Sequence, residues 1–177
     1  FGGMQISLFD KDALVTTQNL KLGALRIHQI LAGMGGTEKE KKQLIQELID
    51  NDIQTFKKLF LKDREVKNII ATGVCALYLG RGAHADKQKI TAEEFQEFYE
   101  SLRDLNEDQV SQKYDIPSEF VSLIVPGAMV YRKLIEVTGA EMIWLPGVRL
   151  GDGIVAEYAE QKKLIRFTHD FSQDILV

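Results

Sequence analysis

Three glycine-bearing turns are the parts of this sequence best suited to do chemistry. Gly2-Gly3 precedes an alternating segment, Thr72-Gly73 follows an apolar run, and Gly147–Gly153 follows a second apolar run. Glycine lets the backbone approach an anion closely, and amides of a loop or a helix N-terminus can donate hydrogen bonds to phosphate oxygens. We therefore expect Gly2, Gly3, Thr72 and Gly73 to bind phosphate, although each turn alone is also typical of an ordinary structural turn.

The third turn carries two charged residues with a possible role beside an anion. Arg149 has the planar fork that binds a phosphate through two parallel hydrogen bonds, so we add it to the phosphate ligands. Asp152 lies between two glycines, where its carboxylate could hold Mg²⁺ or a water molecule. A surface arginine and a helix N-cap are the simpler interpretations of the same two residues.

Two further side chains could take part in a reaction, but the sequence offers neither of them a partner. His28 lies on the apolar stripe of an expected helix, which favours a core or boundary position over a general base. Cys75 follows a glycine turn at a helix start, where a thiolate would be stabilised, but no histidine is near it in the sequence.

Alternation and capping signals predict the elements that must position these residues. Alternating residues predict a strand over Met4–Asp10, and Leu14–Thr17 is expected to return as its hairpin partner. A short helix is expected over Gly23–Leu31. The spacing of Thr37 and Glu40, of Thr91 and Glu94, and of Asn106 and Gln109 predicts three capped helix starts.

The sequence also predicts two interruptions in long helices and the remaining strands, helices and loops. We expect a helix break near Asn51, and a kink or restart near Val125, because Pro126 lacks an amide hydrogen. Buried strands are expected over 66–72 and 142–145, a helix over 74–79, a surface loop over 81–89, and a loop passing into a final helix over 151–161. Strands that alternate with helices predict a sheet covered by helices, with parallel pairing of the later strands.

Composition limits the possible function classes. The 177 residues are 45% apolar and 27% charged, which excludes a disordered or disulfide-stapled chain. A net charge of -4 argues against a nucleic-acid partner, and no apolar run approaches the roughly 20 residues that span a bilayer. The single cysteine makes a cytoplasmic location the expectation.

Several ordered segments resemble a known family. Gly2–Phe9 and Leu20–Arg26 are similar to the stretch of exopolyphosphatase and guanosine-pentaphosphate phosphatase (Ppx/GppA) proteins that follows their phosphate loop. Ile69–Gly73 resembles the second glycine loop of that family. Ile90-Thr91, Ile124–Ala128 and Leu150–Val155 resemble the segments that come next, in the same order.

The resemblance implies an α/β fold of the ribonuclease H-like, actin-like ATPase type, with a mixed sheet covered by helices. Residues 1–161 would form the second lobe of such a phosphatase, without its first strand, and 162–177 a connector towards a C-terminal helical domain. The implied reaction is release of terminal phosphate from polyphosphate or guanosine pentaphosphate by Mg²⁺-assisted attack of water. The resemblance places the catalytic glutamate upstream of residue 1, so this fragment alone is expected to be inactive. The implied partners are the phosphate substrate, the N-terminal lobe of the same protein and, as an option, a second copy.

Departures from the family pattern keep two alternatives open. Met4, Gln5 and Ile6 stand where the family has a hydroxyl residue and a glutamate, and Gly151 stands where it has an arginine. These differences would suit a module that binds a nucleotide or polyphosphate without turnover. A sugar-kinase or acetate-kinase lobe of the same superfamily is the weaker alternative.

Overall fold

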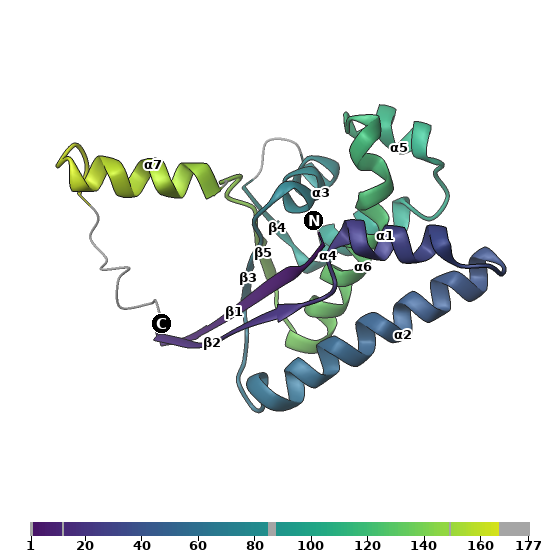
Figure 1. Ribbon diagram of the computed structural model, residues 1–177, viewed down its shortest axis with the longest axis horizontal. Coiled ribbons are helices and arrows are strands. Elements are labelled where there is room, and N and C mark those ends of the chain that lie inside the picture. The colour runs from purple at the N-terminus through teal and green to yellow at the C-terminus, as the bar shows by residue number, and fades with distance from the viewer. Residues whose placement is uncertain (1, 12, 85–87, 149, 167–177) are drawn as a thin grey trace.

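The computed structural model describes residues 2–11, 13–84, 88–148 and 150–166, so Arg149 and most of the expected connector lie outside the described residues. The chain forms an α/β body, with one helix projecting from it (Figure 1). The strands and helices follow one another as β1 (Met4–Asp10), β2 (Ala13–Leu20), α1 (Ala24–Gly33), α2 (Glu38–Phe56), β3 (Asn68–Ile70), α3 (Val74–His84), β4 (Lys89–Thr91), α4 (Ala92–Ser101), α5 (Glu107–Tyr114), α6 (Ser118–Thr138), β5 (Met142–Trp144) and α7 (Leu150–Gln161).

The described strands form two separate sheets. β1 and β2 pair antiparallel, with an irregularity between Leu8 and Phe9, which confirms the expected hairpin. β5 lies between β3 and β4, parallel to β3 and antiparallel to β4. The expected parallel pairing therefore holds for β3 and β5. The sheet is mixed because β4, which was not predicted as a strand and begins at the end of the expected loop, adds an antiparallel edge.

Helix α6 is the centre of the core. Val121, Ile124 and Ala128 pack in a cluster with α3, α4, α5 and the three-stranded sheet. Val130 and Leu134 pack in a second cluster with the hairpin, α1 and α2. α6 contributes buried residues to both clusters and contacts α1 and α3, so it positions these two helices relative to each other.

The predicted break near Asn51 and the predicted restart near Val125 are absent. α2 continues through Asn51, because Ile49, Ile53 and Phe56 keep one face buried. α6 continues through Pro126, whose missing amide leaves the carbonyl of Ser122 without its usual helical donor. Both residues line a cavity of about 380 Å³, which gives that carbonyl room to stay hydrated.

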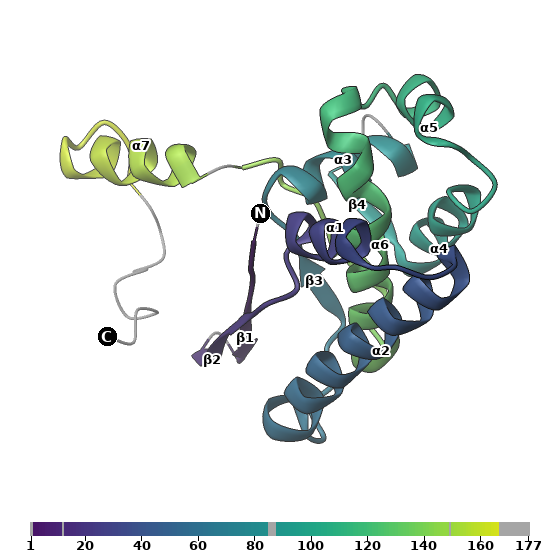
Figure 2. The ribbon, with the colours of Figure 1, turned by 45° about the vertical axis from the view of Figure 1, so that its right-hand side comes forward.

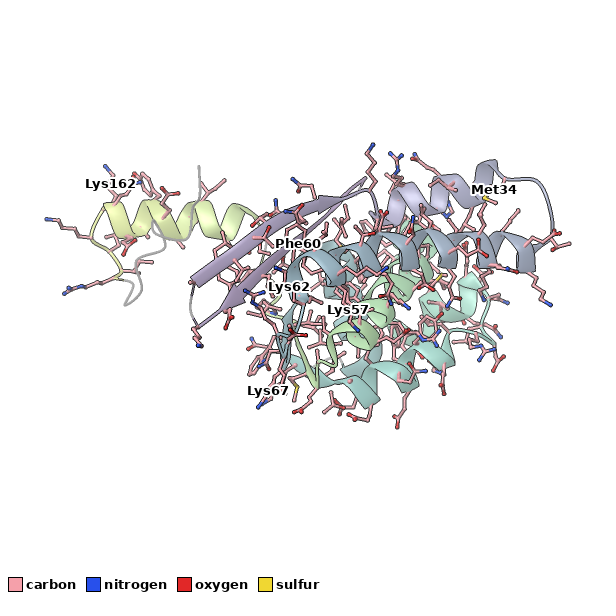
Figure 3. The ribbon with its side chains drawn as sticks, turned by 90° about the horizontal axis from the view of Figure 1, so that it is seen from below. Met34, Lys57, Phe60, Lys62, Lys67 and Lys162 are labelled. Carbon is pink, nitrogen blue, oxygen red and sulfur yellow. The ribbon has the colours of Figure 1, made fainter. Side chains whose placement is uncertain are left out.

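A wide helical turn, η1 (Lys57–Leu61), follows α2 directly and has π-type hydrogen bonding. It brings Leu61 into the core together with Phe56. Just beyond it, Arg64 Nε lies 3.1 Å from the carboxylate of Asp10 and so ties η1 to the hairpin. Figure 3 shows the side chains of Lys57, Phe60 and Lys62 along this segment.

Two further boundaries differ from the sequence expectations. α3 extends to His84, where a loop was expected from residue 81, and residues 85–87 of that loop lie outside the described residues. α7 is helical from Leu150 onward, so the expected loop at its start is wrong. No helix in the described ranges is both long and apolar enough to cross a bilayer.

Candidate functional site: two glycine-capped helix starts

Gly73 begins helix α3 in a conformation that suits glycine. Its φ is +97°, and its carbonyl accepts the hydrogen bond that Leu77 N donates at 3.0 Å. A Cβ at this position would meet nothing within 4 Å, so the requirement for glycine comes from the backbone angle and not from crowding. Thr72 and Gly73 are both exposed, at the end of the loop that follows β3.

Gly23 begins helix α1 in the same chemical way. Its carbonyl accepts a hydrogen bond from Ile27 N at 3.0 Å, and no side chain caps the helix. Since glycine has no side-chain oxygen, the first-turn amides of α1 and α3 receive no acceptor from their own N-cap residues. Such amides, at the positive end of the helix dipole, are suited to bind an anion.

Gly127 of α6 brings these two helix starts together. A Cβ on Gly127 would overlap the sulfur of Cys75 in the first turn of α3 and would lie 3.9 Å from Cβ of Ala24, the first residue of α1. The Cys75 thiol also lies 3.9 Å from the carbonyl oxygen of Leu123, to which it can donate. Figures 1 and 2 both show α1 and α3 against α6. The missing side chain at Gly127 therefore allows both helix starts to reach the same place.

The first glycine pair lies close to the start of α1. Met4 pairs with Leu20 in the hairpin, and a Cβ on Gly3 would lie 3.5 Å from the Leu20 carbonyl oxygen. Leu20 is three residues before Gly23, so the hairpin and α1 bring Gly2-Gly3 beside this helix start. We call Gly2, Gly3, Gly23 and Gly73, with the first turns of α1 and α3, the amide cluster.

The electrostatics of the amide cluster favour binding over nucleophilic attack. Burial raises the pKa of the Cys75 thiol to about 12, so it is neutral at physiological pH and the idea of a stabilised thiolate is wrong. Burial, with a smaller contribution from Cys75, also raises the pKa of Tyr131. Lys21 and Arg26 flank Gly23 in the sequence and are exposed, which adds positive charge near the start of α1.

Asp152 stands on a different part of the molecule. It is an exposed residue in the first turn of α7, the helix that projects from the body (Figure 2). Within the described ranges, no three His, Cys, Asp or Glu side chains gather in a way that could hold a metal ion. The described residues therefore do not form a magnesium site by themselves, and Arg149, the expected neighbour of Asp152, lies outside the described residues.

Sequence reasoning identified three of the four glycines in the cluster and missed the fourth. Gly23 was seen only as a helix boundary, although a glycine directly before Ala24-Leu25 is a signal for an uncapped helix start. Gly127 could have been suspected from its place in an otherwise bulky apolar segment.

His28 takes a peripheral position, as its place on the apolar stripe suggested. It is half-buried and lines the cavity of about 380 Å³ together with Leu31, Val110 and Pro126. The walls of this cavity are largely apolar, and Lys41, Lys42 and Glu107 also line it.

The comparisons with known proteins identify the fold. No protein-family model and no curated protein matches the sequence. Three solved structures from Aquifex aeolicus match the fold: a Ppx/GppA family member (10% identity, TM-score 0.73), a Ppx/GppA phosphatase described as a type II variant (12%, 0.72) and a PPX-GPPA enzyme (11%, 0.71).

These matches also define how much of such a protein is present. The first covers 96% of this chain and 55% of the other. The second and third each cover 89% of this chain and 54% of theirs. The chain thus has the α/β fold of these proteins and spans about half the length of each.

Proposed function

We propose that this chain is the phosphate-binding half of a phosphatase that hydrolyses phosphoanhydrides. The substrate class is inorganic polyphosphate or guanosine pentaphosphate, and the reaction releases the terminal phosphate. The single observation that carries the proposal is the convergence of two glycine-capped helix starts on Gly127, in a chain whose fold matches Ppx/GppA structures.

The contribution of this chain to the reaction is positional and electrostatic. Amides at the starts of α1 and α3 donate to phosphate oxygens, and Gly2-Gly3 and Thr72 complete the cradle. Fixed amide donors stabilise the charge that develops on a phosphate as its anhydride bond breaks. The base that activates water, a glutamate in this proposal, belongs to the other half of the protein.

The proposal includes Mg²⁺, for which this chain offers few ligands. Mg²⁺ commonly binds through one or two carboxylates together with the phosphates of the substrate, and it would neutralise phosphate charge. Asp152 lies on α7, away from the amide cluster, and the described residues gather no metal site, so in this proposal the magnesium ligands come from the substrate and the other half. A cytoplasmic location, where such phosphates are found, is part of the same proposal.

Phosphate release is the direct test. The polypeptide, as its gene encodes it, is incubated with polyphosphate or guanosine pentaphosphate and Mg²⁺, and released orthophosphate is measured. We expect release from at least one of these substrates. A folded protein that releases no phosphate from either would overturn the hydrolase assignment.

Ligand binding by the 177-residue chain tests the amide cluster separately. Titration with tripolyphosphate, followed by ¹⁵N NMR, should shift the amide signals of the first turns of α1 and α3 and of Gly2-Gly3. The amides at the starts of α2 and α5 serve as internal controls, because side chains cap those helices. Equal shifts at capped and glycine-capped starts would contradict a specific site.

A binding module without turnover is the second candidate. It is favoured by the composition of the amide cluster, in which backbone donors, and not carboxylates, are the groups offered to the ligand. Tight binding of tripolyphosphate together with no phosphate release by the whole polypeptide would select this candidate over the first.

A further inference from the structure

The cavity of about 380 Å³ beside α1 has an apolar floor and a charged rim. It is lined by α1, α6 and the first turns of α2 and α5, and Figures 1 and 2 both show these helices on the side of the body away from α7. Its volume falls in the range of roughly 300–1,000 Å³ that is usual for small-molecule sites. We call it the rimmed cavity.

The floor of the rimmed cavity consists of buried apolar side chains. Val110 of α5 and Val121 and Met129 of α6 line it and are 3%, 3% and 8% exposed, so they form a recess. Half-buried Leu31 and Val125 extend this lining. A recess of buried side chains suits the apolar body of a small molecule, whereas protein interfaces are marked by apolar patches that are exposed at the surface.

The rim carries an excess of positive charge. Lys41 and Lys42 at the start of α2 line the cavity, and Glu107 at the start of α5 is the acidic residue among its described lining residues. Half-buried His28 of α1 adds ring nitrogens that can donate a hydrogen bond to an acid group. Because apolar walls strengthen the field of nearby charges, the rim attracts an anionic group.

The floor determines the orientation of such a ligand. Pro126 leaves the carbonyl of Ser122 without its helical donor, and both residues line the cavity. A carbonyl oxygen accepts hydrogen bonds and repels a carboxylate. The acid group of a ligand is therefore favoured beside the lysines and disfavoured at the floor.

We propose that the rimmed cavity binds a small amphipathic carboxylate, with its apolar body on the floor and its acid group beside Lys41 and Lys42. An unbranched fatty acid of medium length is the simplest member of this class. The site is separate from the amide cluster, because α1 contributes its first turn to that cluster and the later residues His28 and Leu31 to the cavity. The proposal goes beyond the proposed function, since it holds whether or not the protein hydrolyses phosphate.

Calorimetric titration with decanoate tests the proposal without reference to activity. Decanoate, kept below the concentration at which it forms micelles, is titrated into the polypeptide as its gene encodes it, and we expect saturable binding. Decyltrimethylammonium has the same chain length and the opposite charge. It should bind at least about tenfold more weakly, because attraction by two lysines becomes repulsion.

Charge substitutions assign the binding to the rim. Lys42→Gln should weaken decanoate binding by about threefold, as expected for the loss of one solvent-exposed ion pair. Lys39→Gln is the matched control, because Lys39 is also exposed at the start of α2 but does not line the cavity. Glu107→Gln removes a repulsive carboxylate and should tighten binding by about twofold.

A blocking substitution assigns the binding to the floor. Ala32 is an exposed residue of α1 that lines the cavity, so Ala32→Trp places an indole in the recess and should abolish decanoate binding. Gln29→Trp adds the same side chain at an exposed position of α1 outside the cavity lining and should leave the affinity unchanged. Equal midpoints of urea unfolding for the two variants would show that both are folded.

Four results would contradict the proposal. The first is the absence of saturable decanoate binding, and the second is equal affinity for decanoate and decyltrimethylammonium. The third is full affinity in Ala32→Trp, which would assign the binding to another surface. The fourth is a dimer that decanoate dissociates in sedimentation, which would assign the cavity to contact with a second copy.

Discussion

Helices α2, α4 and α5 begin differently from α1 and α3. Each of the first three has a complete capping box, formed by Thr37 and Glu40, Thr91 and Glu94, or Asn106 and Gln109. The other two begin at Gly23 and Gly73, whose lack of a side chain leaves the first-turn amides without a local acceptor. Both glycine-capped starts meet at Gly127.

The difference separates helix starts that serve stability from helix starts that serve binding. A capping side chain accepts hydrogen bonds from first-turn amides, and glycine at the N-cap cannot. The loss of helix stability when glycine replaces serine or threonine at the N-cap is only about a few tenths of a kcal/mol. Two glycine N-caps therefore leave first-turn amides without a side-chain acceptor at little expense in stability, although Gly73 is exposed and Gly23 is buried.

The largest effect is expected at the meeting point. Gly127→Val would force a side chain against Cys75 and Ala24 and should lower the free energy of unfolding by about 3 kcal/mol, measured by urea denaturation. Alkylation of the Cys75 thiol should become faster, because displacement of α3 exposes it. Gly33→Ala is the control: its added Cβ meets nothing within 4 Å, so little change is expected. Equal stability of the two variants would show that Gly127 is not a tight contact.

A matched pair of glycines separates binding from backbone strain. Gly73 and Gly139 have φ of +97° and +70°, and an added Cβ at either meets nothing within 4 Å. Alanine at each should cost about 1 kcal/mol of unfolding free energy, because L-residues are disfavoured in this region. Only Gly73→Ala should also weaken tripolyphosphate binding, by about tenfold if one charge-assisted hydrogen bond is lost. Isothermal titration calorimetry would measure this, and an equal loss in Gly139→Ala would contradict the assignment.

The capped helices should respond in stability alone. Thr91→Ala removes the oxygen that accepts from Glu94 N at 3.1 Å and should cost about 1 kcal/mol in thermal or urea unfolding. Thr37→Ala at the exposed start of α2 should cost less. Neither change should alter tripolyphosphate affinity, and a binding defect in either variant would remove the distinction between the two kinds of helix start.

The smallest effect is a local pH dependence at the start of α2. The hydrogen bond from the Thr37 amide, followed by that from its hydroxyl, lowers the pKa of Glu40 below 4.5. Because the folded-state pKa is lowered, the cap is intact above pH 4.5 and is lost as the pH falls through the lower, folded value. The Thr37 amide signal should therefore move in that acidic range by NMR. In Glu40→Gln the same movement should be absent; its persistence would assign the titration to another group.

Local signals explain why the capped helices could be predicted. A capping box depends on two residues three positions apart, so Thr37 with Glu40 and Thr91 with Glu94 were readable without knowledge of the fold. The hairpin depends on similarly local signals, and it is confirmed.

Features that depend on distant partners could not be predicted in this way. β4 consists of Lys89–Thr91 and is a strand only because Ile90 pairs with Ile143, more than fifty positions away. The convergence at Gly127 depends on α1 and α3 packing against α6, which no local spacing encodes. Sequence reasoning could therefore name Gly2, Gly3 and Gly73 separately, but could not show which helix start joins them.

The wide turn η1 also has a consequence for how the length of this chain can change. Its π-type turn places Phe56 and Leu61 in one core cluster although five positions separate them, whereas residues four positions apart share a face of a regular α-helix. Deleting the exposed Lys58 would reduce that separation to four and keep both side chains on the same face. The π-type turn thus contains one residue more than a regular α-helical turn. We expect η1 to tolerate a single-residue deletion that would shift the buried face of an ordinary helix.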